Sequence, residues 1–306
     1  MKLVSEFLGG HRDISKAEIE GLLKSYGGAI SGETDKLLFF HTDHPYKVVS
    51  RVAFSKRVGR VIEDGEEIDI GPRRSFAIRE KRDPGRKSLL DQLAKRIGGR
   101  VDLSNPDVVF HIYNFDEPTN TETLYERRME LLLDPRYKTK PMNHPSSISP
   151  ILARGMINMS GLREGEILVD PFAGTGTYLI EGFRMGILSY GIDRSWRMVE
   201  GGNKNLRHFD FPENIKQGDF SDIASLPKGS TIVTDPPYGR GAKIFSQSRD
   251  SLYSRFYSLI SGLPGVKVFC IPTEELTALA RDFMEIRIAG EIRVHSSLTR
   301  RIAISA

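Results

Sequence analysis

The sequence has few of the features that would place it in a membrane or an oxidising compartment. Cys270 is the only cysteine among 306 residues, so no internal disulfide can form and a reducing compartment fits. No run of about 18 uncharged apolar residues occurs, which argues against a membrane-spanning helix. The N-terminal stretch MKLVSEFLGG lacks the apolar core of a signal peptide. We therefore expect a cytoplasmic protein without a membrane partner.

Charge is unevenly distributed along the chain. The formal net charge is only +4, yet residues 51–100 contain 14 Lys+Arg against 8 Asp+Glu. Because the rest of the chain is slightly acidic, this contrast indicates a polyanion-binding module joined to a second module. A solvated basic face would produce the same count, so charge alone leaves both interpretations open.

The first half of the chain alternates strand-like and helix-like patterns. Strands are expected at 2–8, 36–42, 75–82 and 107–115, and helices at 16–27, capped by Ser15, and at 87–99. Residues 117–150 are polar and proline-rich. We therefore predict an α+β domain over residues 1–117, a linker over 118–143 and a second domain over 144–306.

The second half repeats a strand-then-helix unit. Expected strands lie at 166–170, 188–193, 215–219, 230–237 and 266–272, with a helix after most of them, and 285–296 and 300–306 follow as an antiparallel strand pair. Repeated βα units form a mostly parallel sheet with helices on both faces. The predicted fold class is therefore α/β, a doubly wound sheet preceded by an α+β domain.

The segment LVDPFAGTGTYLIEG lies where the first strand of this sheet gives way to a helix. Gly174 and Gly176 let the backbone approach a ligand, and Thr175 or Thr177 would cap the helix. A dinucleotide fingerprint requires a third glycine where Leu179 stands. Asp170 would repel a pyrophosphate but can bind an ammonium group. These features favour the methionine part of S-adenosylmethionine.

Two further acids follow the next two expected strands. Asp193 ends the second strand, where a carboxylate can accept both ribose hydroxyls of a nucleoside. Asp219 and Phe220 end the third strand, where Asp219 can accept from an adenine amino group while Phe220 packs on the base. A turn-forming acid after glycine is the alternative interpretation of Asp219.

The segment TDPPYGR follows the buried strand that ends at Val233 and Thr234. Two prolines fix φ and remove two backbone donors. An exocyclic amine on a base is a poor nucleophile, because its lone pair is delocalised into the ring. The Asp235 carboxylate and the Pro236 carbonyl supply two acceptors that draw this lone pair back, and Tyr238 offers a stacking face for an extruded base. A strand-ending turn without chemistry is the rival interpretation.

Four segments together resemble the archaeal tRNA guanosine-N2 methyltransferases, most closely the position-10 type. They are HPSSISPILARGMINMSGL, DPFAGTGTYLIEG, TDPPYGR and HSSLTR. The resemblance implies a Rossmann-like methyltransferase domain behind an N-terminal THUMP domain, an RNA-binding module with its core at about 50–116. It also implies S-adenosylmethionine as cofactor and tRNA as partner. No metal is expected, and a small activating subunit is left open.

The resemblance also assigns residues to roles. It implies that the catalytic motif consists of Asp235, Pro236, Pro237 and Tyr238. It implies a cofactor site formed by His144, Ser146, Asp170, Phe172, Gly174, Thr175, Gly176, Asp193, Asp219 and Phe220. Within the THUMP-like segment, the residues placed to contact RNA phosphates are Arg79, Lys81, Arg82, Arg86 and Lys87.

Three alternatives stay open at the level of sequence. The same chemistry would serve another RNA guanosine or the N6 amine of adenine. A non-catalytic RNA-binding factor with a relic cofactor fold belongs to a different class, and the intact DPPY segment argues against it. The sequence does not choose between one added methyl group and two.

Overall fold

The computed structural model describes residues 1–115, 117–127, 134–225, 229–238, 249–295 and 298–305. The chain forms two compact units, and each is assembled from separate segments. The first unit contains Met1–Leu8, Gly27–Ser50 and Ser55–Arg127, and the second contains Gly9–Tyr26, Arg51–Phe54 and Arg128–Ala306. No described helix has both the length and the apolar character needed to cross a bilayer.

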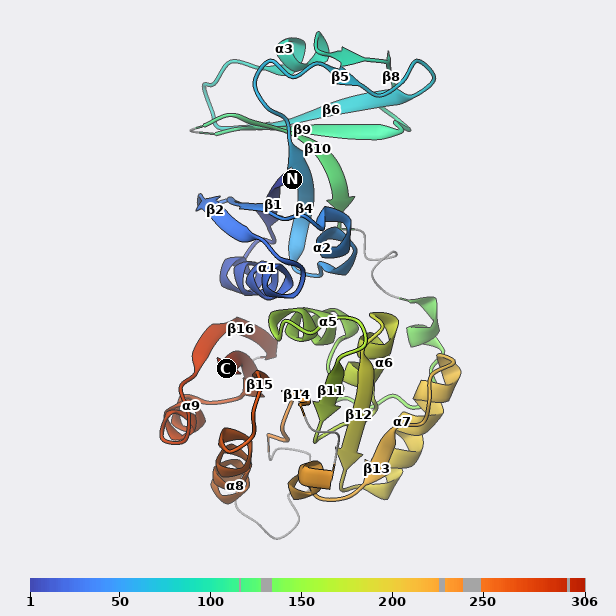
Figure 1. Cartoon of the computed structure of the whole chain (residues 1–306), viewed down its shortest axis with the longest axis vertical. Helices are drawn as coiled ribbons and strands as arrows, with labels where there is room; N and C mark the ends of the chain where they lie inside the picture. Colours follow the sequence, from blue (N-terminus) through green and yellow to red (C-terminus); the bar gives the residue numbers. More distant parts are fainter. Residues whose placement is uncertain (116, 128–133, 226–228, 239–248, 296–297, 306) are drawn as a thin grey trace. The chain divides into compact units, whose positions relative to one another are not determined.

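The first unit is built on one mixed sheet (Figure 1). Its strands, in spatial order, are β2 (Ala29–Glu33), β3 (Leu37–His41), β1 (Lys2–Phe7), β4 (Ser55–Val61), β10 (Thr119–Glu126), β9 (Val108–Asn114), β6 (Ser75–Arg82) and β8 (Arg100–Val101). β6 runs parallel to both β9 and β8, and the other pairs are antiparallel. The first unit is therefore α+β, as expected.

Short elements complete the first unit. They are α2 (Pro45–Arg51), α3 (Leu90–Ala94) and a two-stranded pair formed by β5 (Ile68–Asp69) and β7 (Ile97–Gly98). Phe76 of β6, Leu93 of α3 and Phe110 of β9 are buried in one apolar cluster. Burial of such side chains stabilises this half of the sheet, because each removes apolar surface from water.

Three local predictions in the N-terminal half are wrong. The stretch predicted as a linker, residues 118–143, contains β10, which is bonded on both sides within the sheet. Ser15 lies inside α1 (Arg12–Tyr26) and donates to the His11 carbonyl at 2.8 Å instead of capping the helix. The helix predicted at 87–99 is only α3, because residues 97–98 pair with β5.

The second unit contains a seven-stranded sheet. Its strands, in spatial order, are β13 (Ile215–Gln217), β12 (Leu188–Asp193), β11 (Ile167–Asp170), β14 (Thr231–Thr234), β15 (Lys267–Ile271), β17 (Leu298–Ser305) and β16 (Arg287–His295). The first five are parallel, whereas β17 is antiparallel to both β15 and β16. The predicted doubly wound sheet with a closing antiparallel pair is confirmed.

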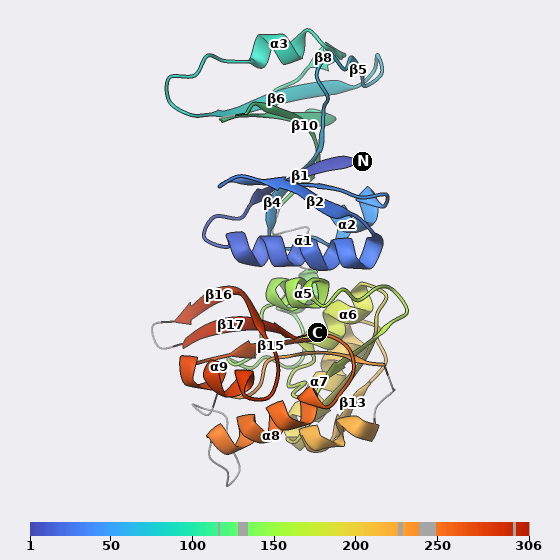
Figure 2. The same cartoon turned by 60° about the vertical axis from the view of Figure 1, so that its left-hand side comes forward.

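Helices cover both faces of this sheet, because alternate residues of each strand point to opposite sides. Val169 of β11 packs with residues of α8 (Arg249–Ser261) and α9 (Glu274–Arg281) in an aromatic-rich cluster. Figure 2 shows α8 and α9 on the same side of the sheet. The opposite face carries α5 (Pro150–Met159), α6 (Thr177–Arg184) and α7 (Trp196–His208).

The N-terminal helix α1 packs in the second unit, against α5 and β16 (Figure 1, Figure 2). Gly21 makes the contact with α5 possible, since a Cβ atom there would lie 2.2 Å from the Asn158 carbonyl oxygen. The buried Glu18 carboxylate accepts from the Asn158 side chain and from the backbone N–H groups of Ala53 and Phe54, each at 2.8 Å. These bonds compensate for burying the carboxylate.

Candidate active site

Four aspartates lie at one edge of the parallel sheet. Asp170 and Asp193 are the last residues of β11 and β12, while Asp219 and Asp235 follow β13 and β14. The four strands are neighbours in the order β13-β12-β11-β14, so their carboxyl ends meet at the same edge. The strand order reverses at β11, and open α/β sheets bind their ligands at such a point.

Asp170 is a buried carboxyl group with only neutral bonding partners. Its Oδ1 accepts from the backbone N–H of Phe172 at 3.0 Å and from the Thr234 hydroxyl at 2.5 Å. Burial raises the pKa of Asp170 to about 7, and the nearby charges of Asp193 and Asp235 add to this rise. No cation among the described residues contacts it, so a ligand ammonium group fits the missing counter-charge.

The loop between β11 and α6 needs its two glycines. Gly174 has φ of 51° and Gly176 has φ of 81°, a region that residues with a Cβ rarely adopt. Gly176 itself is the N-cap of α6 and provides no side-chain bond, so the predicted threonine cap is wrong. Thr175 is buried, and its hydroxyl lies 2.9 Å from that of Ser147.

Asp193 holds this loop in place. Its Oδ2 accepts from the backbone N–H of Gly174 and its Oδ1 from that of Ser195, both at 2.8 Å. Burial raises the pKa of Asp193, although the two hydrogen bonds oppose the rise. A carboxylate offers about four lone-pair positions, so two remain for ribose hydroxyls.

The segment at residues 142–147 is attached to the same loop. His144 Nδ1 lies 2.7 Å from the Ser146 hydroxyl, and within the described part of the chain no hydrogen bond joins either side chain to the four aspartates. Asn205, to which sequence reasoning gave no role, joins this segment to the loop. The buried Asn205 side chain on α7 accepts from Met142 N at 2.8 Å and donates to the Thr175 carbonyl at 3.0 Å. No local sequence pattern marked this role of Asn205.

Phe172 and Phe220 meet below the carboxyl edge near Asp219. Their ring centroids are 5.3 Å apart, and Phe220 is only 5% exposed. Phe172, which is half-buried, is the more open of the two rings. Although partial burial alone would raise it, the pKa of Asp219 is lowered by hydrogen bonds from Ser221 and by the charge of Arg255, 3.4 Å away. A charged acceptor therefore stands beside an aromatic surface.

The Asp-Pro-Pro-Tyr segment places its two acceptors beside β14. The Asp235 Oδ1 accepts from the Tyr238 hydroxyl, and Oδ2 accepts from Arg300 Nε at 3.0 Å. The Pro236 carbonyl oxygen is 3.4 Å from the hydroxyl of buried Tyr253, which donates to it. Each acceptor retains a free lone pair. Gly239 and Arg240, which end the quoted motif, lie outside the described residues, as do Ser296 and Ser297 of the segment HSSLTR.

Arg300, the last residue of the segment HSSLTR, is a second functional residue to which sequence reasoning gave no role. It lies on β17, its side chain is 8% exposed, and its Nε also donates to the Tyr238 oxygen at 2.9 Å. Burial raises the pKa of Asp235, and the Arg300 charge is the strongest influence opposing that rise. Arg300 therefore favours the ionised form of the buried carboxylate and fixes its direction. The alternation of charged and apolar residues in TRRIAIS marked a strand and gave no sign of this pairing.

Replacing Arg300 with methionine should weaken catalysis in a pH-dependent way. An opposite charge in contact shifts a carboxyl pKa by about one to three units. Without it the pKa of Asp235 rises, so the rate at neutral pH should fall by about 10-fold or more and recover as the pH is raised. The measurement is the pH profile of kcat.

Arg301→Met is the matched control for Arg300→Met. Arg301 is the next residue of β17, so it points to the other face, where it pairs with Glu274 and Glu291 at 2.8 Å. Its pH profile should match that of the unsubstituted protein. A uniform loss in Arg300→Met at every pH would contradict the proposed effect on Asp235.

The five predicted RNA contacts lie on the first unit and differ in their surroundings. Lys81 at the end of β6 is ion-paired with Glu6, which also binds Arg57 at 2.9 Å. Arg79 donates to the Leu103 carbonyl at 3.3 Å. Arg82 is exposed and 4.0 Å from Glu80, while Arg86 and Lys87 lie in the loop between β6 and α3. Arg79, Arg82 and Lys87 are exposed, whereas Lys81 and Arg86 are half-buried.

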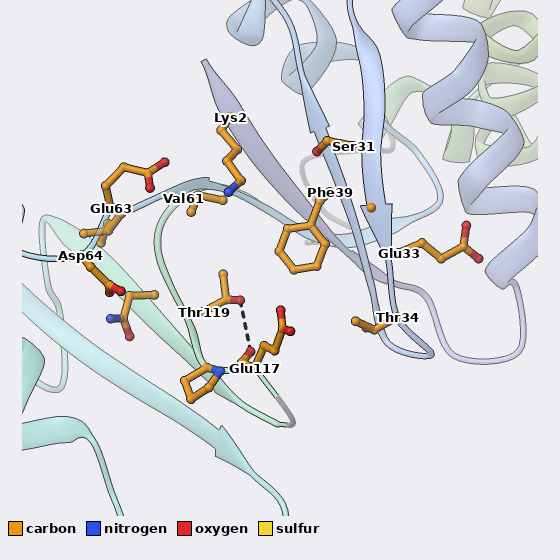
Figure 3. A pocket seen from close by; sticks show the side chains of 14 residues that line it. Lys2, Ser31, Glu33, Thr34, Phe39, Val61, Glu63, Asp64, Glu117 and Thr119 are labelled. Carbon is orange, nitrogen blue, oxygen red and sulfur yellow. Dashed lines mark hydrogen bonds between the residues drawn. The ribbon is translucent and has the colours of Figure 1, made fainter.

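The first unit also contains a cavity of about 520 Å³ (Figure 3). Its lining includes four carboxylates and one ammonium group, contributed by Glu33, Glu63, Asp64, Glu117 and Lys2. This excess of negative charge repels phosphate. RNA contacts are therefore expected on other parts of the unit.

Comparisons with known proteins identify relatives of this chain. A family model described as "RMKL-like, methyltransferase domain" (UPF0020) matches residues 137–302. The tRNA (guanine(10)-N2)-dimethyltransferase of Methanothermobacter thermautotrophicus is 31% identical over 322 residues, covering 96% of each chain. The enzyme of the same name from Pyrococcus abyssi is 29% identical over 321 residues, again covering 96% of each chain.

Solved structures agree on the fold. TrmN from Thermus thermophilus has a TM-score of 0.51 at 15% identity, covering 100% of this chain and 99% of its own. A possible methylase from Clostridium difficile 630 has a TM-score of 0.52 at 15% identity, covering 100% and 98%. The resemblance predicted from the motifs is thus confirmed by sequence over nearly the whole chain. Because the family model spans more than half of its residues, the chain belongs to the UPF0020 family of methyltransferases.

Proposed function

We propose that this protein transfers methyl groups from S-adenosylmethionine to the exocyclic N2 amino group of guanosine 10 in tRNA. We further propose that two methyl groups are added, giving N2,N2-dimethylguanosine. Both relatives reported above match nearly the whole chain and carry names for this reaction. As an enzyme acting on tRNA, it would work in the cytoplasm.

The observation that carries the proposal is the pair of acceptors at Asp235 and Pro236, next to the switch point of the sheet. The guanine N2 amine has two N–H bonds. One can point to the carboxylate and the other to the carbonyl, which returns electron density to the nitrogen. The lone pair of an amine held in this way is less delocalised into the ring, so it is available to attack the methyl group.

We also propose a role for each cofactor-binding residue. Asp170 would bind the methionine ammonium group, Asp193 the ribose hydroxyls and Asp219 the adenine amine, with Phe172 beside the base. S-adenosylmethionine supplies a methyl group bonded to positively charged sulfur. As the amine attacks this carbon, the carbon–sulfur bond breaks and its electrons stay on sulfur. Asp235 then accepts the proton that the nitrogen loses, because it is the nearest anion to that nitrogen.

The N-terminal region, residues 1–117 with a THUMP-like core at about 50–116, would bind the tRNA by shape and charge. Arg79, Arg82 and Lys87 are the exposed cations among those predicted. Contacts of this kind position the RNA without reading its sequence. Guanosine choice would then depend on where the folded tRNA places its extruded base.

Substituting Arg82, Arg86 and Lys87 together with glutamine should weaken tRNA binding by about 10-fold and flatten its salt dependence. Each lost phosphate contact lowers the slope of log K against log salt by roughly 0.7 to 0.9. Binding at several salt concentrations measures both effects. The charge-matched control changes Arg163, Lys204 and Arg207, which are exposed cations of the second unit paired with glutamates. Unchanged affinity at low salt would identify residues 82–87 as a solvated face only.

The proposed function is tested with the purified protein alone, labelled S-adenosylmethionine and two tRNA transcripts. One carries guanosine at position 10, and the other carries inosine, which lacks only the N2 amine. Nucleoside mass spectrometry should find N2-methyl- and N2,N2-dimethylguanosine in the first transcript and no methylation at position 10 in the second. A methylated adenosine, or equal label in both transcripts, would overturn the proposal.

A further inference from the structure

Trp196 is the only tryptophan of the chain, and it is 62% exposed at the first position of α7. A single exposed apolar side chain is ordinary on a protein surface. Its place in the fold is less ordinary. The preceding residue, Ser195, donates its backbone N–H to Asp193 at 2.8 Å, so Trp196 follows directly on the turn formed at the proposed ribose-binding carboxylate.

Two arginines lie close to this tryptophan in the sequence. Exposed Arg194 stands two residues before it, and exposed Arg197 directly after it. We call Arg194, Trp196 and Arg197 the Trp196 patch. Among the described residues, Arg197 has no ion-pair partner.

The acidic side chains near the patch are already bonded elsewhere. Both Asp193 oxygens accept backbone N–H groups, and Asp219 is paired with Arg255. Glu200, one turn along α7, is paired with Lys204 at 2.8 Å. The patch therefore keeps a net positive charge around an exposed aromatic ring, the combination that binds unpaired nucleotides through stacking and phosphate contacts.

The patch is also within reach of the reacting base. β12 and β14 are separated only by β11, and neighbouring strands lie about 4.8 Å apart. The ends of β12 and β14 are therefore about 10 Å apart, a distance that a chain of one or two nucleotides spans. A base extruded to Asp235 brings its unpaired neighbours to this edge of the sheet.

We propose that the Trp196 patch is a contact surface for the substrate RNA, in which Trp196 stacks on an unpaired nucleotide adjacent to the target guanosine. Arg197 binds a flanking phosphate. This inference rests on the proposed function for the identity of the RNA. It assigns a second RNA contact, on the methyltransferase unit, besides the basic residues of the first unit.

The unique tryptophan gives a direct readout. Its fluorescence is recorded while an unmodified tRNA transcript is titrated into the full-length protein, with N-acetyltryptophanamide as the control for absorption by RNA. Saturating tRNA should quench the emission, at the same midpoint as tRNA binding measured independently. S-adenosylhomocysteine alone should leave most of the emission unchanged.

Variants test the contact without this fluorescence. Trp196→Ala should weaken tRNA binding on the order of 10-fold, because aromatic stacking on a base contributes strongly to affinity, whereas Trp196→Phe should retain most of it. Leu188→Ala is the matched control, since Leu188 is 47% exposed at the opposite, amino end of β12. Arg197→Gln should flatten the salt dependence, and Arg207→Gln, at the other end of α7, should not.

Two results would overturn the inference. One is a protein that methylates tRNA while saturating tRNA leaves the Trp196 emission unchanged. The other is a response to S-adenosylhomocysteine alone, with Trp196→Ala weakening cofactor binding and not tRNA binding, which would make the residue a cover for the cofactor. Both results leave the proposed function standing. Absence of any methylated guanosine would instead remove the function on which the inference rests.

Discussion

Asp235→Ala is expected to lower the rate of methyl transfer at saturating cofactor and tRNA by about 1,000-fold, the effect of removing one preorganised polar group from a reacting centre. The substitution removes the carboxylate that accepts from the target amine and receives its proton. The dissociation constant of S-adenosylmethionine should change by no more than several-fold, because the proposed cofactor contacts lie on β11, β12 and β13. Single-turnover kinetics and equilibrium cofactor binding provide the two measurements.

The ion pair between Asp235 and Arg300 complicates this variant, and a double substitution corrects for it. Alanine at position 235 leaves the Arg300 guanidinium buried without a counter-charge, which typically costs about 3–5 kcal/mol of stability. Asp235→Ala combined with Arg300→Met removes both charges. The double variant should regain stability while methyl transfer stays lost. If stability and activity returned together, the carboxylate would have only a structural role.

Asp235→Asn separates hydrogen bonding from charge. Its amide oxygen can still accept one N–H bond, so partial activity is expected. Loss of cofactor binding in either single variant, with turnover at saturation unchanged, would contradict the role given to Asp235.

Asp170→Asn is expected to weaken S-adenosylmethionine binding by about 100-fold or more. The buried carboxylate is the proposed counter-charge of the methionine ammonium group, and breaking a buried ion pair costs about 3 kcal/mol or more. Asparagine retains an oxygen that can accept from Phe172 N and Thr234, so the local structure should persist. Calorimetric titration measures the affinity directly. Methylthioadenosine, which lacks the amino-acid part, should bind both proteins equally.

Cofactor affinity should also depend on pH through Asp170. Its pKa is raised to about 7, so the group is largely protonated and neutral below that pH in the ligand-free protein. Binding an ammonium group requires the ionised form and releases a proton. Affinity should therefore fall about 10-fold for each pH unit below 7 and level off above it. In Asp170→Asn this dependence should disappear, and its persistence would show that another group titrates.

The same pKa shift fixes the sign of a stability effect. The unfolded chain ionises Asp170 near its ordinary value of 3.8, whereas the folded protein ionises it near 7. Between these values the folded state holds the extra proton. The contribution of Asp170 to stability therefore decreases as the pH rises through this window.

Much of the second unit could be predicted because its sequence signals are local. The acids Asp170, Asp193 and Asp235 stand at the ends of apolar strands. Parallel strands bring their carboxyl ends to one edge of the sheet, whatever the conformation of the connecting loops. Gly174 and Gly176 signal their backbone conformation in the same local way. The positions of these residues therefore followed from pattern alone.

The features that sequence reasoning missed depend on contacts between distant residues. Arg300 reaches Asp235 across 65 positions, and Asn205 joins Met142 to Thr175 through bonds that no local pattern marks. The placement of α1 in the second unit depends on the fit of Gly21 against Asn158. Such contacts follow from the packed fold, so a periodicity argument cannot find them.

The most direct test of the central claim is a crystal structure of the protein with S-adenosylhomocysteine and a tRNA substrate. The Asp235 carboxylate and the Pro236 carbonyl should each lie within hydrogen-bonding distance of the guanine N2 atom, with that nitrogen facing the cofactor sulfur. A complex in which Asp235 keeps only Arg300 and Tyr238 as partners, and the guanine amine lies elsewhere, would contradict the account.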